Sequence, residues 1–201
     1  MIDNNNAVHP CTQPYKGCPN IPRINPVNPA ATDADTGATL GAIKAKIGMV
    51  PNLYATFAQS PAVLNGFLAL SDALSKGALT AGQRAIVALA TAQANQCHYC
   101  LSAHTLLGKN AGLSPDAILA ARHGKGENAQ DNAVAALAAR LVETRGSVND
   151  ADVAAARSGG LDDARIVEVI AHVSLNVMTN FTNNVAQTDI DFPVVDLAIA
   201  A

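Results

Sequence analysis

Apolar residues recur at helical spacing along most of this chain. From about Thr36 onward they stand three or four positions apart, as Leu40, Ile43 and Ile47 do, so each group would share one face of a helix. The same spacing predicts further helices over about 61–74, 81–95, 97–107, 128–145, 150–157 and 162–187, with another beginning at Pro115. Apart from a short ambiguous run at 194–199, no segment alternates as a β-strand does. The sequence therefore predicts an all-α, multi-helix bundle.

Local signals mark several of the helix ends. Ser60-Pro61 and Ser114-Pro115 each place an N-cap residue before a proline at the first helical position. Thr80 and Gln83 have the spacing of a capping box, and Gly48 is a plausible stop for the first helix. These signals agree with the helices that the apolar spacing predicts.

The first 35 residues follow a different pattern. They are rich in asparagine and contain Pro10, Pro14, Pro19, Pro22, Pro26 and Pro29. Proline at this density removes amide donors and blocks helix formation. We therefore expect residues 1–35 to form an extended or disordered arm and residues 36–201 to form the helical domain.

Composition and charge exclude some classes of function and predict an oligomer. Alanine supplies much of the 49% hydrophobic content, and aromatic residues are only 3%. Small side chains bury little area each, so we expect a homo-oligomer, which would bury more. A net charge of -3 without a basic stripe argues against nucleic-acid binding. No apolar run is long enough to cross a membrane and no secretory signal is visible, so we expect a cytoplasmic protein.

The chemically informative segment contains Cys97, Cys100 and His104. On a helix these residues, three and then four positions apart, share one face. Two thiols at this spacing can reach each other for a disulfide if the first turn relaxes. The helix N-terminus favours a thiolate, and the imidazole one turn away can accept the thiol proton. The pattern predicts a redox-active dithiol.

Other interpretations of the cysteines stay open. They could be small buried hydrophobic residues, or zinc ligands together with His104 and a fourth group such as His98, Cys11 or Cys18. Covalent haem attachment is excluded, because Leu101 stands where the histidine would have to follow the second cysteine. Cys11 and Cys18 could pair with each other, although free thiols are favoured in a reducing cytosol.

The segment 79–108, LTAGQRAIVALATAQANQCHYCLSAHTLLG, resembles the core motif of the carboxymuconolactone decarboxylase family, and within it the alkylhydroperoxidase D-like, peroxidase-related branch. The segments GMVPNL at 48–53, SPAVL at 60–64, AHVSLNV at 171–177 and DFP at 191–193 resemble the same branch. The likeness spans about residues 36–195. It implies a helical thiol-dependent peroxide reductase without haem or metal, commonly assembled as a dimer, trimer or hexamer.

The resemblance also implies roles for individual residues. Cys100 would be the peroxidatic thiol, Cys97 the resolving thiol and His104 part of a proton relay. Tyr99, before the second cysteine, would line the pocket or simply pack. The implied substrate is an alkyl hydroperoxide, and the implied reductant is a lipoyl or thioredoxin-type dithiol protein.

The sequence departs from the family pattern at Ala85, where the family relay usually has a glutamate. Alanine carries no proton, so the relay must be incomplete, rerouted or lost. Gln93, one turn before Cys97, is a candidate to hydrogen-bond a water but is no base. Glu168 is a carboxylate that could fold back into the site, although an ordinary exposed glutamate is the simpler interpretation.

Two other functions remain as alternatives. One is a redox-sensing helical oligomer that oxidises once and does not turn over, which Ala85 favours. The other is the decarboxylase or lactonase-type activity of the family, although that branch generally lacks the dithiol. On the helix over 162–187, His172 is interpreted as a core histidine. The asparagines at 176, 180 and 184 could form a polar seam in an oligomer interface or a solvated face.

Overall fold

The computed structural model describes residues 21–199, which form helices and connecting loops without a β-strand. The helices are α1 (Ala34–Ile47), α2 (Asn52–Phe57), α3 (Pro61–Leu74), α4 (Ala81–Ala94), α5 (His98–Asn110), α6 (Pro115–Arg122), α7 (Ala129–Glu143), α8 (Asp150–Ser158) and α9 (Asp163–Ala186). The predicted all-α fold class is confirmed. The run at 194–199 is neither helix nor strand.

The predicted helix signals are found where they were expected. Gly48 ends α1 in the left-handed conformation, with φ 84°. Thr80 and Gln83 make the complete capping box of α4, and the Ser114 side chain caps α6. Ser60 is the N-cap residue of α3, although its side chain makes no capping hydrogen bond.

Helix α2 was not predicted. Its six residues are too few to show a period of 3.6. Its first amide is satisfied from far along the chain, because the Asn52 N–H donates to Asp191 Oδ2 at 2.7 Å. A helix this short depends on tertiary contacts, which the local sequence does not reveal.

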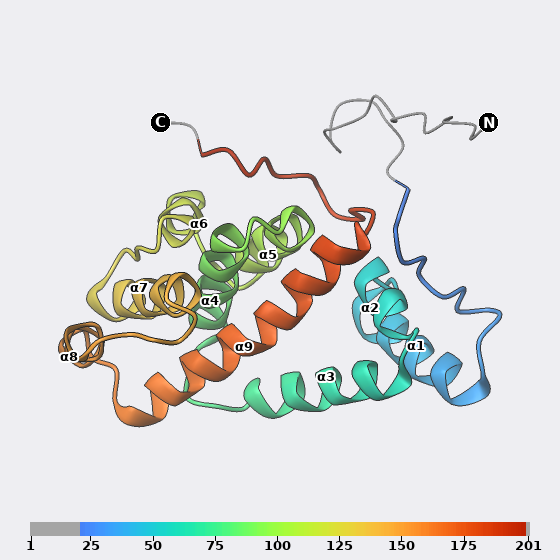
Figure 1. The fold of residues 1–201 in the computed structure, drawn as a ribbon, viewed down its shortest axis with the longest axis horizontal. Coiled ribbons are helices and arrows are strands. Elements are labelled where there is room, and N and C mark those ends of the chain that lie inside the picture. Colours follow the sequence, from blue (N-terminus) through green and yellow to red (C-terminus); the bar gives the residue numbers. More distant parts are fainter. Residues whose placement is uncertain (1–20, 200–201) are drawn as a thin grey trace, which may run out of the picture.

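Helix α4 is the centre of the bundle and packs against α5, α6, α7 and α9. Its Ile86, Val87 and Leu89 side chains are at most 2% exposed. A helix covered on most sides needs apolar residues around most of its circumference, and the alanines of α4 meet that requirement without bulk. The long helix α9 crosses the molecule beside α4, with α1 and α2 at one end and α7 and α8 at the other (Figure 1).

The described part of the N-terminal arm, residues 21–33, is non-helical and lies on the helical domain. The Arg23 N–H donates to the carbonyl of Ala186 at 2.7 Å, and the Val27 N–H donates to that of Ala55 at 3.0 Å. Helix α1 begins at Ala34, two residues before the expected boundary. The rest of the predicted arm, including His9, Cys11 and Cys18, lies outside the described residues.

The C-terminal segment after α9 crosses α5 and is held by side chains. The Val195 N–H donates to Ser102 Oγ at 3.1 Å, and Arg122 donates to the carbonyls of Asp196 and Leu197. Gln93 accepts from Arg122 and donates to the Leu197 carbonyl at 3.0 Å. Gln93 therefore holds this segment in place.

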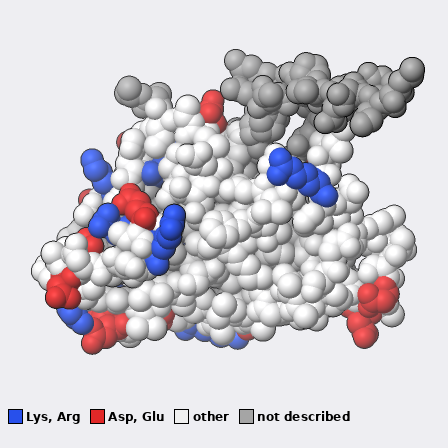
Figure 2. Space-filling view, viewed as in Figure 1, with Lys and Arg blue, Asp and Glu red and all other residues white. Residues whose placement is uncertain are grey.

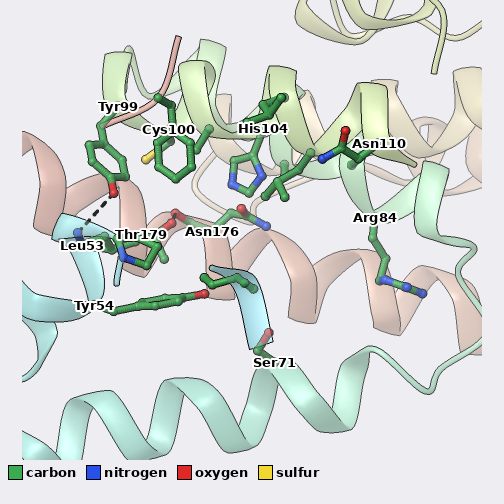
Figure 3. A pocket seen from close by; sticks show the side chains of 18 of the residues that line it. Leu53, Tyr54, Ser71, Arg84, Tyr99, Cys100, His104, Asn110, Asn176 and Thr179 are labelled. Atoms are coloured by element: carbon green, nitrogen blue, oxygen red, sulfur yellow. Dashed lines mark hydrogen bonds between the residues drawn. The ribbon is translucent and has the colours of Figure 1, made fainter. Parts of the chain in front are cut away.

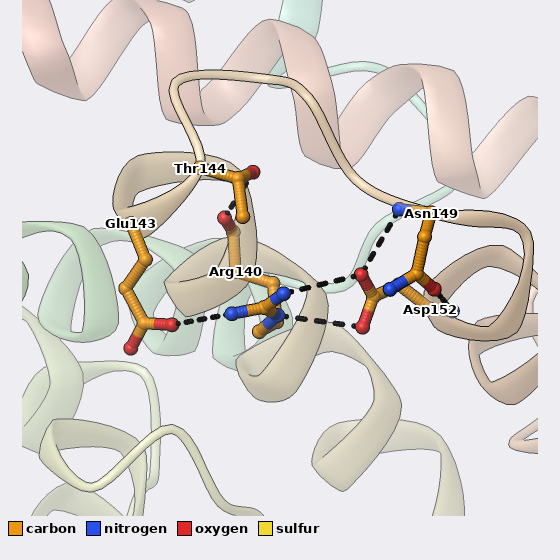
Figure 4. Close-up of polar contacts among 5 residues, drawn as sticks. All are labelled: Arg140, Glu143, Thr144, Asn149 and Asp152. Carbon is orange, nitrogen blue, oxygen red and sulfur yellow. Dashed lines mark hydrogen bonds and ion pairs between the residues drawn. The ribbon is translucent and has the colours of Figure 1, made fainter.

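The ion pair between Arg140 and Asp152 fixes α8 onto α7 at the end of the molecule far from α1 and α2. Arg140 contacts Glu143 at 3.0 Å and Asp152 at 3.3 Å, and Asp152 also completes a capping box with Asn149 (Figure 4). Charged side chains gather at this end, while the middle of the same face is largely uncharged (Figure 2). Within residues 21–199, no helix is both long and apolar enough to cross a membrane.

Glu168 joins α9 to the loop between α3 and α4. Its carboxylate accepts the backbone N–H groups of Ala78, at 2.7 Å, and Leu79, at 3.0 Å. The hydrogen bond from Ala78 is the main cause that lowers the pKa of Glu168. The carboxylate is thus used in a structural contact, and Glu168 is not among the residues that line the pocket described below.

Gly77 should be required for this contact, because a Cβ there would lie 2.6 Å from the Glu168 carboxyl group. The Gly77 backbone is not left-handed, so alanine fits the conformation but displaces the carboxylate. We expect Gly77→Ala to lower the free energy of unfolding by about 1–2 kcal/mol in the native chain. In a Glu168→Ala background it should have almost no effect. Urea denaturation of the double-mutant cycle measures this coupling, and equal losses in both backgrounds would contradict it.

Candidate active site

The two cysteines meet at the start of α5. Helix α4 ends at Ala94, and Gln96 turns the chain with φ 52°. Cys97 is the N-cap residue of α5 and not its first helical residue as predicted, and its Sγ accepts the Cys100 N–H at 3.2 Å. The two residues form a disulfide with a Cα–Cα distance of 5.3 Å. The extended backbone of the N-cap residue supplies the relaxed first turn that the pairing needs.

The two sulfurs differ in their surroundings. Cys97 is fully buried, while Cys100, only 2% exposed, lines a pocket. The Asn183 side-chain amide, from α9, donates to Cys100 Sγ at 3.3 Å. An amide donor and the N-terminus of α5 would both favour negative charge on Cys100 in the reduced protein.

His104 lies one turn after Cys100 and lines the same pocket. Burial lowers its pKa to about 4, against a smaller opposing effect of its hydrogen bond with the Asn176 side chain. With the disulfide formed, the imidazole is therefore neutral at pH 7. A neutral imidazole can accept a proton, as the predicted role requires.

The pocket has a volume of about 750 Å³, within the range of small-molecule sites. Its walls are formed by helices α3, α4, α5 and α9, the end of α1, the loop that leads into the start of α2, and residues 191–193. Most of its lining is apolar, and the polar side chains shown in Figure 3 come from several of these elements. One cavity thus brings together a disulfide sulfur, an imidazole and space for an organic molecule.

Tyr99 both lines the pocket and packs. Its Oη accepts the Leu53 N–H at 3.2 Å, which ties α5 to α2 (Figure 3). Its ring meets Phe192 edge-on, with centroids 5.5 Å apart. Burial raises the pKa of Tyr99, so its hydroxyl stays protonated at neutral pH. The two roles left open for this residue coexist.

The other predicted groups lie in different places. Ala85 lines the pocket, so its methyl group occupies a position open to the cavity. Gln93 is not among the lining residues and is engaged by Arg122 and Leu197. His98 is buried against the C-terminal segment, with a hydrogen bond to the Val195 backbone. Across residues 21–199, no three His, Cys, Asp or Glu side chains are grouped to hold a metal ion.

The asparagines of α9 face the interior of the chain. Asn176 contacts His104, Asn180 accepts from the Asn95 side chain, and Asn184 donates to the Asn95 carbonyl. Neither a solvated face nor an oligomer seam describes them, because their partners lie on α5 and on the α4–α5 turn.

Two polar residues of the site were missed in the sequence. Asn183 stands outside the four-residue repeat of asparagines, so no spacing singled it out. Asp191 lines the pocket and is the N-terminal acceptor for α2. It lies in the DFP segment, but no local pattern predicts that this carboxylate reaches a pocket wall.

Comparison with known proteins agrees with this geometry. The sequence model of the carboxymuconolactone decarboxylase family matches residues 61–142. A crystal structure of a peroxidase-related protein with an alkylhydroperoxidase AhpD core, from Ralstonia eutropha JMP134, is 27% identical with a TM-score of 0.77, over 85% of this chain and 93% of that one. Residues 61–142 therefore match the carboxymuconolactone decarboxylase family, and the chain has the alkylhydroperoxidase D-like fold.

More distant structures share the fold. A peroxidase-related protein from Silicibacter sp. TM1040 is 22% identical with a TM-score of 0.71, over 83% of this chain and 92% of that one. The debrominase Bmp8, in complex with 2,3,4-tribromopyrrole, is 15% identical with a TM-score of 0.71, over 84% of this chain and 91% of that one. No curated protein matches the sequence significantly. The family match and the Ralstonia eutropha structure indicate an enzyme of this class.

Burial of neutral His104 should make the protein sensitive to acid. The unfolded imidazole takes up a proton near pH 6.5, whereas the folded one does so only near pH 4. Stability should therefore fall as the pH drops between these values, by up to about 3 kcal/mol from this residue. The His104→Gln variant should not show this acid-induced loss of stability. The matched control is His123→Gln, at an exposed position, which should keep the loss. Urea denaturation from pH 7 to pH 4 measures it, and equally steep losses in all three proteins would refute the assignment.

Proposed function

We propose that this protein is a thiol-dependent hydroperoxide reductase. The observation that carries the proposal is the position of the Cys97–Cys100 disulfide, whose Cys100 sulfur lines a largely apolar pocket together with a neutral imidazole. Cys97 is buried behind it and has no place in the pocket lining. This asymmetry supports Cys100 as the attacking thiol and Cys97 as the resolving thiol.

The proposed cycle begins with the reduced dithiol. The Cys100 thiolate attacks the terminal oxygen of the hydroperoxide, the O–O bond breaks, and the alkoxide leaves as an alcohol after gaining a proton. Cys100 is then a sulfenic acid. The Cys97 sulfur displaces its hydroxyl as water and re-forms the disulfide. An external dithiol reduces the disulfide by exchange and is itself oxidised to a disulfide.

His104 would hold the proton that this cycle moves. Its pKa is low beside the uncharged disulfide, but a thiolate one turn away would raise it by Coulomb attraction. The imidazole could then accept the Cys100 proton and return it to the departing alkoxide. The amide of Asn183 and the N-terminus of α5 would stabilise the thiolate meanwhile.

Burial of both sulfurs constrains the reductant. Cys97 and Cys100 are at most 2% exposed, so a protein surface does not reach the disulfide in this conformation. A lipoyl group on a flexible arm could enter through the pocket, whereas a thioredoxin-type protein would need α5 to open first. We therefore favour a lipoyl-type donor among the two predicted classes.

The homo-oligomer also remains a prediction. Helix α9 exposes Val167, Phe181 and Val185, each more than half accessible. These side chains would give a second copy of the chain an apolar surface to cover.

Turnover of organic hydroperoxide with a dithiol donor tests the proposed reaction. In a Cys11→Ser/Cys18→Ser background, which removes the arm thiols, we expect full activity. Adding Cys100→Ser should abolish it, and adding Cys97→Ser should permit one oxidation, to a sulfenic acid detectable by mass spectrometry, without turnover. His104→Gln should lower the rate about 10²–10⁴-fold.

A single oxidation by the parent protein, with no second turnover, would instead indicate the redox sensor. Because a debrominase shares the fold, 2,3,4-tribromopyrrole is a useful competing substrate. Consumption of that compound with no consumption of hydroperoxide would reject the proposed reaction.

Ala85→Glu should increase the rate of peroxide reduction at least about tenfold, because it places a proton-carrying group in the pocket wall where the family relay has one. Ala85→Gln is the matched control, since it adds the same bulk without a titratable proton. Steady-state rates with the dithiol donor at saturation give the comparison. Equal rates for the glutamate and glutamine variants would show that no relay passes through this position.

A further inference from the structure

The pocket contains a second polar group away from the cysteine. Arg84, in the second turn of α4, lines the cavity, and in Figure 3 its guanidinium lies at the opposite side from Cys100 and Tyr99. One of its nitrogens donates to the carbonyl of Leu79 at 2.5 Å. Within the described part of the chain, no carboxylate lies within ion-pair distance of it. A cation in a mostly apolar cavity thus lacks a counter-charge.

His172 provides a second, independent observation. It lines the same cavity from α9, is only 5% exposed, and its Nε2 is buried without a hydrogen-bond partner. The ring has a hydrogen bond with the Leu74 backbone, and Nε2 is the ring nitrogen that is left without a partner. The charges that face it are Arg84 from α4 and Glu168 one turn away on α9. Buried polar atoms normally have a partner, and a ligand can supply one here.

These two groups match a carboxyl group. The guanidinium can donate two parallel hydrogen bonds to a carboxylate, and Nε2 can accept the hydrogen of a protonated carboxyl or take up its proton and donate. A phosphate monoester would bring nearly two negative charges to a single cation in an apolar cavity, which is costly. A wholly apolar ligand would leave Arg84 desolvated without compensation.

We infer that Arg84 and His172 form a carboxylate subsite, and that the pocket takes an amphipathic organic acid. Its apolar body would lie against the apolar part of the lining, to which Leu107, Leu175 and Phe67 belong, and its other end would reach Cys100. The subsite and the proposed function together indicate that the substrate is an organic hydroperoxide that bears a carboxylate. This assignment of the substrate rests on the proposed function. The subsite would orient the peroxide toward the sulfur by holding the far end of the molecule.

Binding of a non-reactive acid tests the subsite separately from catalysis. By isothermal titration calorimetry at pH 7.5, we expect octanoate to bind the native protein at least tenfold more tightly than octanamide, which has the same shape without the charge. Arg84→Gln should abolish this preference, and Arg84→Lys should keep part of it. Arg157→Gln is the matched control, because Arg157 is exposed on α8 and pairs with Asp163. Equal affinities for octanoate and octanamide in the native protein would overturn the inference.

A kinetic comparison links the subsite to the reaction. For a fatty-acid hydroperoxide, Arg84→Gln should raise KM about 10–100-fold, while KM for cumene hydroperoxide should stay within twofold. If neither hydroperoxide is turned over but the octanoate preference depends on Arg84, the subsite stands and the reductase proposal fails. If both are turned over with equal changes in KM and octanoate shows no preference, the reductase proposal stands and the subsite is wrong.

Discussion

The contact between the polar side of α9 and the start of α5 is the constraint on which the site depends. Asn176, Asn180 and Asn183 are buried on α9, and each has to find a partner inside the protein. Their partners are His104, Asn95 and the sulfur of Cys100. The same amides therefore set how α5 is rotated against α9, and the rotation decides that Cys100 and His104 line the pocket.

The cavity itself is a consequence of small side chains. Helix α4 presents Ala81, Ala85 and Ala88 to the pocket, and methyl groups do not fill the space toward α3 and α9. The alanine side chains bury little apolar area in the core, and for the same reason they leave space in the pocket for a small molecule. Position 85 contributes a methyl group and no carboxylate to the pocket wall.

Several neighbouring elements hold this arrangement from outside. The C-terminal segment adds residues 191–193 to the pocket wall and is itself held by Arg122, Gln93 and Ser102. Asp191 in that segment caps α2, and Tyr99 of α5 accepts a hydrogen bond from α2. The dithiol is therefore enclosed by parts of the chain that are far apart in sequence, which is consistent with reagents that are small or carried on an arm.

The sequence alone determined the helices and the reactive segment, because both are encoded locally. Capping residues, proline at the first helical position and apolar spacing act within a few residues, and so does the Cys-x-x-Cys-x-x-x-His spacing on α5. The sequence did not reveal helix α2, the hydrogen bonds that hold Glu168 and Gln93, or the contacts of the α9 asparagines with α5. Each depends on a partner between 29 and 139 positions away, such as Asp191 for Asn52. Only the tertiary structure decides such contacts, because a side chain acquires its role from the surface that folding brings against it.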